Sequence, residues 1–321
     1  MNKRAYPLIA AALLAATVLG AQENPVNPGG KYHKAFTENF DGRESGYFIE
    51  RRDRISEEED FRFFSGIPSL TEKGTDVMMY RIDPAERAGA GRGPEIISRK
   101  YTSYGSYSAR FRVPDVRKVQ PDAGAVVGYF TYNNEKGKGL SEIDIEILVA
   151  DPRIIYIGTW TGKGALQRVG RIINLATGEI LETIYRSDHD GNIHHPLTGM
   201  QNQPESIEAI EDFDASRQFY TYGFDWYPDR LVWWILHPAT GERVVLWDYQ
   251  GGTPDFSGIP DNRTYYRLNF WHTDNWPVET RTGSIERPAY PYELEIDWMS
   301  YEPFKEAGAY GRQEKQKQKK K

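Results

Sequence analysis

Residues 142–146, Glu-Ile-Asp-Ile-Glu, constrain the fold of this chain more than any other segment. Side chains alternate between the two faces of a β-strand, so a strand here presents its three acids on one face. Ile143, Ile145 and Ile147 then line the opposite face. Like charges placed close together raise one another's pKa values, which makes the acidic face electrostatically costly. A fold tolerates that cost where it uses carboxyl groups in different protonation states.

Short β-rich segments separated by Gly, Pro, Asp and Asn turns run through most of the chain. The strands that we expect cover residues 106–113, 125–132, 141–148, 154–160, 219–226, 231–236, 266–271 and 293–301. No window keeps helical periodicity for long, and there is no internal repeat. Many short strands with a turn every ten or so residues predict one all-β domain, either a sandwich or a barrel.

The first 21 residues have the composition of a secretory signal peptide. Lys3 and Arg4 are followed by an apolar run over residues 8–18 and then by the small residues Gly20 and Ala21. That run is about half of the ~20 residues that a membrane span needs. We therefore predict an exported protein, extracellular or periplasmic, without a membrane span. The chain contains no cysteine, which excludes a disulfide framework and thiol chemistry.

The last segment, residues 305–321, is a Lys-rich tail that is too polar to bury and is expected to be disordered. It is either a solvated terminus or a means of weak adhesion to anionic surfaces. The signal carries a charge of +2 and the tail +5, so the overall −6 becomes −13 for residues 22–304. So acidic a domain is a poor nucleic-acid binder, and the charge argues less strongly against a polyanionic polysaccharide substrate.

Two charged segments, residues 51–60 and 185–214, have the composition of loops. The second contains Asp188-His189-Asp190-Gly191-Asn192 and then His194-His195, residue types that can bind a metal ion. However, Gly191 stands one place too early for the EF-hand pattern, and no Glu closes the loop. The pattern favours a plain loop over a metal site.

The three acids match the requirements of glycoside hydrolysis, which uses one ionised carboxylate and one protonated carboxyl. In a flat strand the Cα atoms of Glu142 and Glu146 lie about 13 Å apart. The carboxyl groups must approach to about 5–5.5 Å for a retaining enzyme or about 6.5–9.5 Å for an inverting one, so the sheet must curve. We assign Glu142 as nucleophile, Glu146 as general acid and base, and Asp144 as the group that separates their pKa values. The alternative is an edge strand whose acidic solvent face discourages aggregation.

Tryptophans are frequent in the strand-rich half, and sugar rings stack on aromatic faces. They are Trp160, Trp226, Trp233, Trp234, Trp271 and Trp276. Most are expected to pack in the core. Trp271 differs, because it shares a strand face with Asn269, while Leu268 and Phe270 point the other way. This polar and aromatic face predicts the wall of a cleft.

The chain resembles glycoside hydrolase family 16, the group of lichenases, laminarinases and xyloglucan endotransglycosylases. The central match is residues 142–146, in the form without an inserted residue. Flanking matches are Tyr-Gly-Ser-Tyr-Ser-Ala-Arg-Phe-Arg-Val-Pro at 104–114, Tyr-Gly-Phe-Asp-Trp at 222–226, Asp-Arg-Leu-Val-Trp at 229–233, Leu-Asn-Phe-Trp at 268–271 and Glu-Ile-Asp-Trp-Met-Ser-Tyr at 295–301. They occur in consistent order over about residues 100 to 301.

The resemblance implies a concanavalin-like jelly-roll β-sandwich of two curved antiparallel sheets with a concave substrate cleft, formed by residues 22–304. It implies a retaining endo-glycosidase acting on a β-glucan, with β-1,3 or β-1,3-1,4 linkages, and with Glu142, Asp144 and Glu146 in the roles above. A transglycosylase, or a carbohydrate-binding or structural surface protein without turnover, are the alternatives. We expect a monomer without a cofactor. A structural calcium ion is compatible with this expectation.

The resemblance also suggests substrate-binding residues. Asn269 and Trp271 match lichenase cleft residues, and Trp160 stands where lichenases place a cleft tyrosine. Two positions depart from the lichenase pattern: Leu140 replaces a tryptophan, and Gly158 replaces an asparagine. These departures concern the sugar that is bound and leave the three acids intact.

Overall fold

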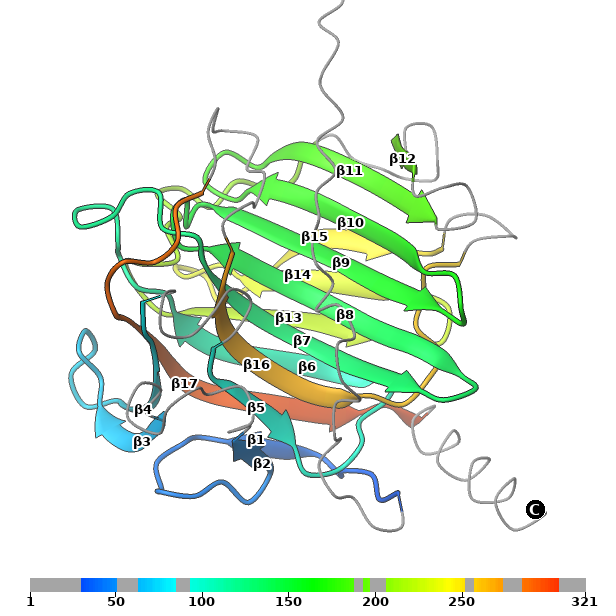
Figure 1. Ribbon diagram of the computed structural model, residues 1–321, viewed down its shortest axis with the longest axis horizontal. Coiled ribbons are helices and arrows are strands. Elements are labelled where there is room, and N and C mark those ends of the chain that lie inside the picture. The colour runs from blue at the N-terminus through cyan, green and yellow to red at the C-terminus, as the bar shows by residue number, and fades with distance from the viewer. Residues whose placement is uncertain are drawn as a thin grey trace, which may run out of the picture.

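The computed structural model describes residues 30–50, 63–84, 93–187, 193–196, 206–251, 257–273 and 285–305 (Figure 1). The predicted signal peptide, the expected loop at 51–60, Trp276 and the tail after residue 305 lie outside these residues. So does the Asp-His-Asp-Gly-Asn run at 188–192. No helix in the described residues is long and apolar enough to cross a membrane.

The described residues form two stacked antiparallel sheets, and the larger one has nine strands (Figure 1). In spatial order its strands are β12 (Ile193–Pro196), β11 (Glu179–Ser187), β10 (Gln167–Asn174), β9 (Ile154–Gly162), β8 (Gly139–Leu148), β7 (Ala125–Glu135), β16 (Tyr265–His272), β5 (Glu95–Ser98) and β2 (Phe48–Glu50). The acidic strand β8 therefore lies in the middle of the larger sheet, which excludes the edge-strand alternative.

The second sheet has eight strands. Its order is β15 (Arg243–Tyr249), β14 (Leu231–Leu236), β13 (Tyr220–Trp226), β6 (Gly105–Arg112), β17 (Tyr292–Pro303), β4 (Asp76–Ile82) and β3 (Phe63–Pro68), and β1 (Phe36–Glu38) also pairs with β17. The predicted all-β sandwich of two antiparallel sheets is thereby confirmed.

The core between the sheets is strongly aromatic. Trp226, Trp233 and Trp247 are fully buried in it, as expected for the first two. Trp298, for which core packing is also expected from the sequence, is only partly buried. Tyr129 and Tyr266 are also fully buried, and their hydroxyl groups share a hydrogen bond of 2.8 Å. A buried Tyr hydroxyl needs a partner, so this pairing lets polar rings fill an apolar interior.

The eight expected strands are all present, and their ends differ from the expected ones by at most three residues. The expectation of a loop over residues 185–214 was wrong in part. Residues 185–187 close β11, and residues 193–196 form β12, which pairs with β11. Main-chain pairing overrides polar composition there, because β12 needs no apolar face of its own to extend the sheet edge.

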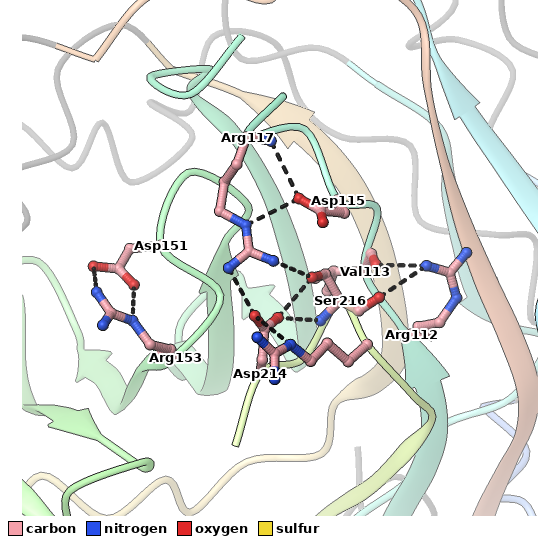
Figure 2. A network of polar contacts seen from close by, with 9 residues as sticks. Arg112, Val113, Asp115, Arg117, Asp151, Arg153, Asp214 and Ser216 are labelled. Carbon is pink, nitrogen blue, oxygen red and sulfur yellow. Dashed lines mark hydrogen bonds and ion pairs between the residues drawn. The ribbon is translucent and has the colours of Figure 1, made fainter. Parts of the chain in front are cut away.

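A network of charged groups fastens one end of the sandwich (Figure 2). Arg117 binds Asp115 at 2.9 Å and Asp214 at 2.7 Å, and Asp214 also accepts hydrogen bonds from the main chain and hydroxyl of Ser216. Arg112 donates to the main-chain carbonyl of Ser216 at 3.1 Å. The loop before β13 is thus tied to the end of β6.

A hollow of about 540 Å³ lies beside this network, lined among others by Arg117, Asp151, Arg153 and Asp214. These four side chains form ion pairs with one another, Arg153 with Asp151 at 2.9 Å and Arg117 with Asp214. None of the three acids of residues 142–146 lines the hollow, and its charges hold loops together.

Candidate active site

The acidic strand β8 has the two faces that its alternation predicts. Ile143, Ile145 and Ile147 are 0%, 0% and 1% exposed and pack between the sheets. Glu142 and Glu146 are partly exposed on the outer face, and Asp144 between them is 5% exposed. We call this outer side of the nine-stranded sheet the acidic face.

Strand pairing gives each acid two neighbours on the acidic face, one from β7 and one from β9. The three rows are Tyr132–Glu142–Trp160, Phe130–Asp144–Gly158 and Gly128–Glu146–Tyr156. Adjacent strands lie about 4.8 Å apart, so the six neighbours lie directly beside the three acids. The first acid is flanked by two aromatic rings, and the other two each have a glycine on one side.

Two arginines flank the rows. Arg267 on β16 is the register partner of Phe130, and Arg168 on β10 is the partner of Trp160. Arg267 forms a buried ion pair with Glu95 at 2.7 Å, and both side chains are 1% exposed. Sequence reasoning missed these three residues, because they reach the acidic face only through pairing of strands far apart in the chain.

Arg168 makes its described contacts with aromatic groups. Its guanidinium lies 4.9 Å from the ring centre of Tyr156 and 5.2 Å from that of Trp160. Its Nε donates a hydrogen bond of 3.1 Å to the Tyr156 hydroxyl. A cation over an aromatic face is attracted by the ring quadrupole, so this geometry fixes the guanidinium on the sheet surface.

Burial changes the protonation of all three acids. It raises the pKa of Glu142 to about 8, assisted by the charge of Glu146 and opposed by Arg267 and Arg168. It raises the pKa of Glu146 to about 7, opposed by Arg168. Burial and the two glutamates hold the pKa of Asp144 well above its usual range. The acids therefore keep part of their protons at neutral pH, while the arginines stabilise the remaining negative charge.

The predicted substrate-binding residues all lie on the acidic face, in different settings. A Cβ atom added to Gly128 would lie 2.4 Å from Oδ1 of Asn269, so Asn269 reaches over Gly128 toward the row of Glu146. Trp271, two residues further along β16, is partly exposed. Trp160 lies next to Glu142 but is only 5% exposed, and the guanidinium of Arg168 lies over its ring.

Hydrogen bonds from the second sheet and to residues 258–262 hold β8 and its neighbour β9 in place. Trp233 on β14 donates its indole N–H to the main-chain carbonyl of Asp144 at 3.1 Å. Ser141 and Thr159 donate to the main-chain carbonyls of Asn262 and Gly258, at 3.1 and 2.6 Å. Such supports fix the positions of side chains on rigid strands, as a catalytic constellation requires.

Two solved structures share this fold. The β-glucanase of Bacillus licheniformis is 18% identical, with a TM-score of 0.52 over 85% of this chain and 99% of that one. A β-1,3-1,4-glucanase (lichenase) from a mouse hindgut metagenome is 19% identical, with a TM-score of 0.50 over 85% and 100%. The likeness confirms the predicted concanavalin-like jelly roll.

Sequence comparison points to the same group. β-Glucanases of Paenibacillus polymyxa and Paenibacillus macerans are 26% and 25% identical over 190 and 193 residues. These alignments cover 57% of this chain and 56% of each relative, so the chain matches little more than half of their length. A sequence model of glycosyl hydrolases family 16 matches residues 69–299, most of the chain. The chain therefore belongs to glycosyl hydrolases family 16.

Proposed function

We propose that the protein is a secreted retaining endo-glycosidase that hydrolyses internal β-glycosidic bonds of a β-glucan, with β-1,3 or β-1,3-1,4 linkages. The observation that carries this is the set of three acids with raised pKa values on one face of β8, Asp144 buried and the two glutamates partly buried, between two arginines. Retaining hydrolysis needs a negative nucleophile and a protonated acid within one site. The assigned roles therefore require Glu142 to be the group that ionises for the reaction, although its pKa of about 8 exceeds the pKa of about 7 of Glu146.

In the proposed reaction, the carboxylate of Glu142 attacks the anomeric carbon and forms a glycosyl ester. Glu146 gives its proton to the departing glycosidic oxygen as that bond breaks. Glu146, now a carboxylate, takes a proton from water, whose oxygen attacks the same carbon and releases Glu142. Two inversions leave the β configuration unchanged. Asp144, between the two, keeps their proton affinities apart.

The sugar class rests on the names of the sequence relatives and on the aromatic residues of the acidic face. Both Paenibacillus relatives are β-glucanases. Trp271 and Tyr132 present partly exposed rings, and Asn269 presents an amide, along the rows of the acids. Rings for stacking and an amide for sugar hydroxyl groups are what a neutral glycan uses. Export follows from the predicted signal peptide at 1–21.

The experiment is digestion of barley β-glucan, laminarin, xyloglucan, agarose and carrageenan, with product sizing and proton NMR of the new reducing ends. Short oligosaccharides with initially β anomers from the first or second substrate support the proposal. Products longer than the donor, formed when an oligosaccharide acceptor is added, indicate the transglycosylase. Binding to a glycan without any release indicates the surface protein.

Two variants test the assigned roles. Glu146→Gln should lose about 10²–10⁴-fold in kcat on polysaccharide and much less on an aryl glycoside whose leaving group needs no proton. An equal loss on both substrates would contradict the acid role. Glu142→Ala should abolish turnover on either substrate while the far-UV circular dichroism stays unchanged.

A further inference from the structure

Gly158 and Gly170 lie opposite each other on β9 and β10, in the row of Asp144. Neither has a positive φ, so backbone conformation does not require glycine there. Space does. A Cβ atom on Gly158 would lie 2.1 Å from the Tyr156 hydroxyl, and one on Gly170 would lie 2.7 Å from the Tyr156 ring. The Tyr156 side chain lies flat across β9 and β10 in the space above the two glycines. We call this space, bounded by Gly158 and Gly170, the glycine seat.

This seat determines where Arg168 goes. Tyr156 starts in the row of Glu146 but places its hydroxyl over the row of Asp144, where it accepts the Nε hydrogen bond of Arg168. The guanidinium is thereby drawn from the row of Glu142 toward the middle of the acidic face. Trp160 supports it from the same row.

Among the described residues, no carboxylate pairs with the buried Arg168. Arg168 is 2% exposed, forms no ion pair within the described part of the chain, and its Nη1 has no hydrogen-bond acceptor there. A buried charge is costly unless an opposite charge compensates it. The compensating charge at longer range is that of the acids, since Arg168 lowers the pKa values of Glu142, Asp144 and Glu146 against the effect of burial.

Other ionisable groups also border the acidic face, and their charges add to or offset the effect of Arg168 on the pKa values of the three acids. Among the described residues they are Tyr132 on β7, Tyr156 on β9, Glu182 on β11, Tyr265 and Arg267 on β16, and Glu95 on β5. The charge of Arg267 is offset by Glu95 at 2.7 Å. Glu182 also feels Arg168, which opposes the rise of its pKa on burial.

We propose that Arg168 is a positioning residue of the acidic face: Tyr156, seated over Gly158 and Gly170, holds the guanidinium where its charge keeps one of the three carboxyl groups ionised. That the ionised carboxylate serves as a nucleophile rests on the proposed function. That Arg168 keeps a carboxyl group ionised does not rest on it, so experiments can contradict one claim without contradicting the other.

The direct test is carbon-13 NMR titration of the Asp and Glu carboxyl groups in the intact chain, for wild type, Arg168→Met and Arg168→Lys. Arg168→Met should move the titration of the acidic-face carboxyl groups upward by about one pH unit, since an opposite charge nearby has been removed. Arg168→Lys should restore most of the shift. Unchanged titration in a folded Arg168→Met variant overturns the proposal, whether or not the wild type is active.

Activity gives a second readout. The acidic limb of the kcat/KM profile reports ionisation of the nucleophile in the free enzyme, and it should move upward in Arg168→Met by the same interval. Tyr156→Phe keeps the ring in its seat and removes the acceptor, so it should move the limb in the same direction by less. A wild type without activity on any glycan counts against the proposed function alone, because the NMR arm still decides the role of Arg168.

Arg171 supplies the matched control. It lies three residues further along β10, faces the core, is fully buried and lies 4.3 Å from the ring centre of Trp247. Arg171→Met should lower stability and leave the carboxyl titration and the acidic limb in place. If Arg171→Met moves them as far as Arg168→Met does, the effect is a general response to losing a buried arginine, and the proposal is wrong. If Arg168→Met does not fold, the carboxyl titration and the acidic limb are compared between the wild type, Arg168→Lys and Tyr156→Phe.

Discussion

The indole N–H of Trp233 donates a hydrogen bond of 3.1 Å to the main-chain carbonyl of Asp144 and so joins β14 to β8 through the core. Trp233 is fully buried, and its ring stacks on Trp247 with a centre-to-centre distance of 5.6 Å. The second sheet therefore acts directly on the strand that carries the acids, at the middle acid of the three.

Trp233→Phe should lower the free energy of unfolding by about 1–3 kcal/mol, because a hydrogen bond is lost and a small cavity is left. It should also lower kcat about 10-fold, since the acids lose their support from behind. Urea unfolding and initial rates measure the two effects. Trp226→Phe is the comparison, because Trp226 donates a similar bond of 2.9 Å to Pro260, in a loop rather than on the strand that carries the acids. A similar fall in kcat in both variants would remove the special role of Trp233.

Stability should fall as the pH rises from 5 to 8. The folded-state pKa values of Glu142 and Glu146, about 8 and about 7, lie above the unfolded value of 4.5. The folded state therefore binds more protons in this window, and the stability present below the unfolded pKa is lost as pH rises through the folded one. Urea unfolding at pH 5, 6.5 and 8 should show a loss of several kcal/mol, with an upper bound of about 6 kcal/mol if both glutamates titrate independently.

Glu142→Gln should flatten this pH dependence and raise stability at pH 8, because it removes an ionisable group whose charged form is disfavoured beside the other two acids. Asp115→Asn is the control, since Arg117 lowers the pKa of Asp115 and its titration falls below this window. The linkage argument fails if the slope between pH 5 and 8 is the same in Glu142→Gln as in the wild type.

Arg112→Met should destabilise the fold by about 3–5 kcal/mol, because it leaves Glu295 buried and without its ion-pair partner at 2.7 Å. Asp115→Asn, which breaks the exposed pair with Arg117, should cost less than about 1 kcal/mol. Both pairs belong to the same end of the sandwich, so denaturant midpoints of the two variants compare buried and exposed pairs directly. Equal midpoints would show that burial adds nothing here.

Trp271→Ala should raise KM for β-glucan by about 2–12-fold with little change in kcat, the range expected for loss of one aromatic contact. Trp160→Phe keeps a ring under Arg168 and should change KM less than about threefold. Initial rates over a range of oligosaccharide concentrations separate the two. A larger KM effect at Trp160 would make it the main stacking surface in spite of its burial.

The strands that carry the acids could be predicted because their alternation is local. Acids and isoleucines alternate along β8, so the strand alone places its three acids on one face, whatever the rest of the fold. β10 could not be predicted in the same way. Its two arginines, Arg168 and Arg171, point to opposite faces and both are buried, so the segment has no continuous apolar face to reveal it.

The surroundings of the acids depend on register, which a single sequence does not contain. Arg168 reaches the acidic face by way of β9, and Glu95 reaches it by way of β16. The aromatic and amide positions of β16 could be predicted from alternation, whereas the covering of Trp160 by Arg168 could not. The departure at position 158 showed that an asparagine was missing, and only the structure shows that the Tyr156 ring occupies the space.

The glycine seat also limits how this sheet can change over evolutionary time. An alanine at 158 or 170 would collide with the Tyr156 ring, and a smaller residue at 156 would leave Arg168 without its anchor. The side chains at 156, 158 and 170 therefore constrain one another, and a substitution at one of them that keeps Arg168 in place needs a compensating change at another.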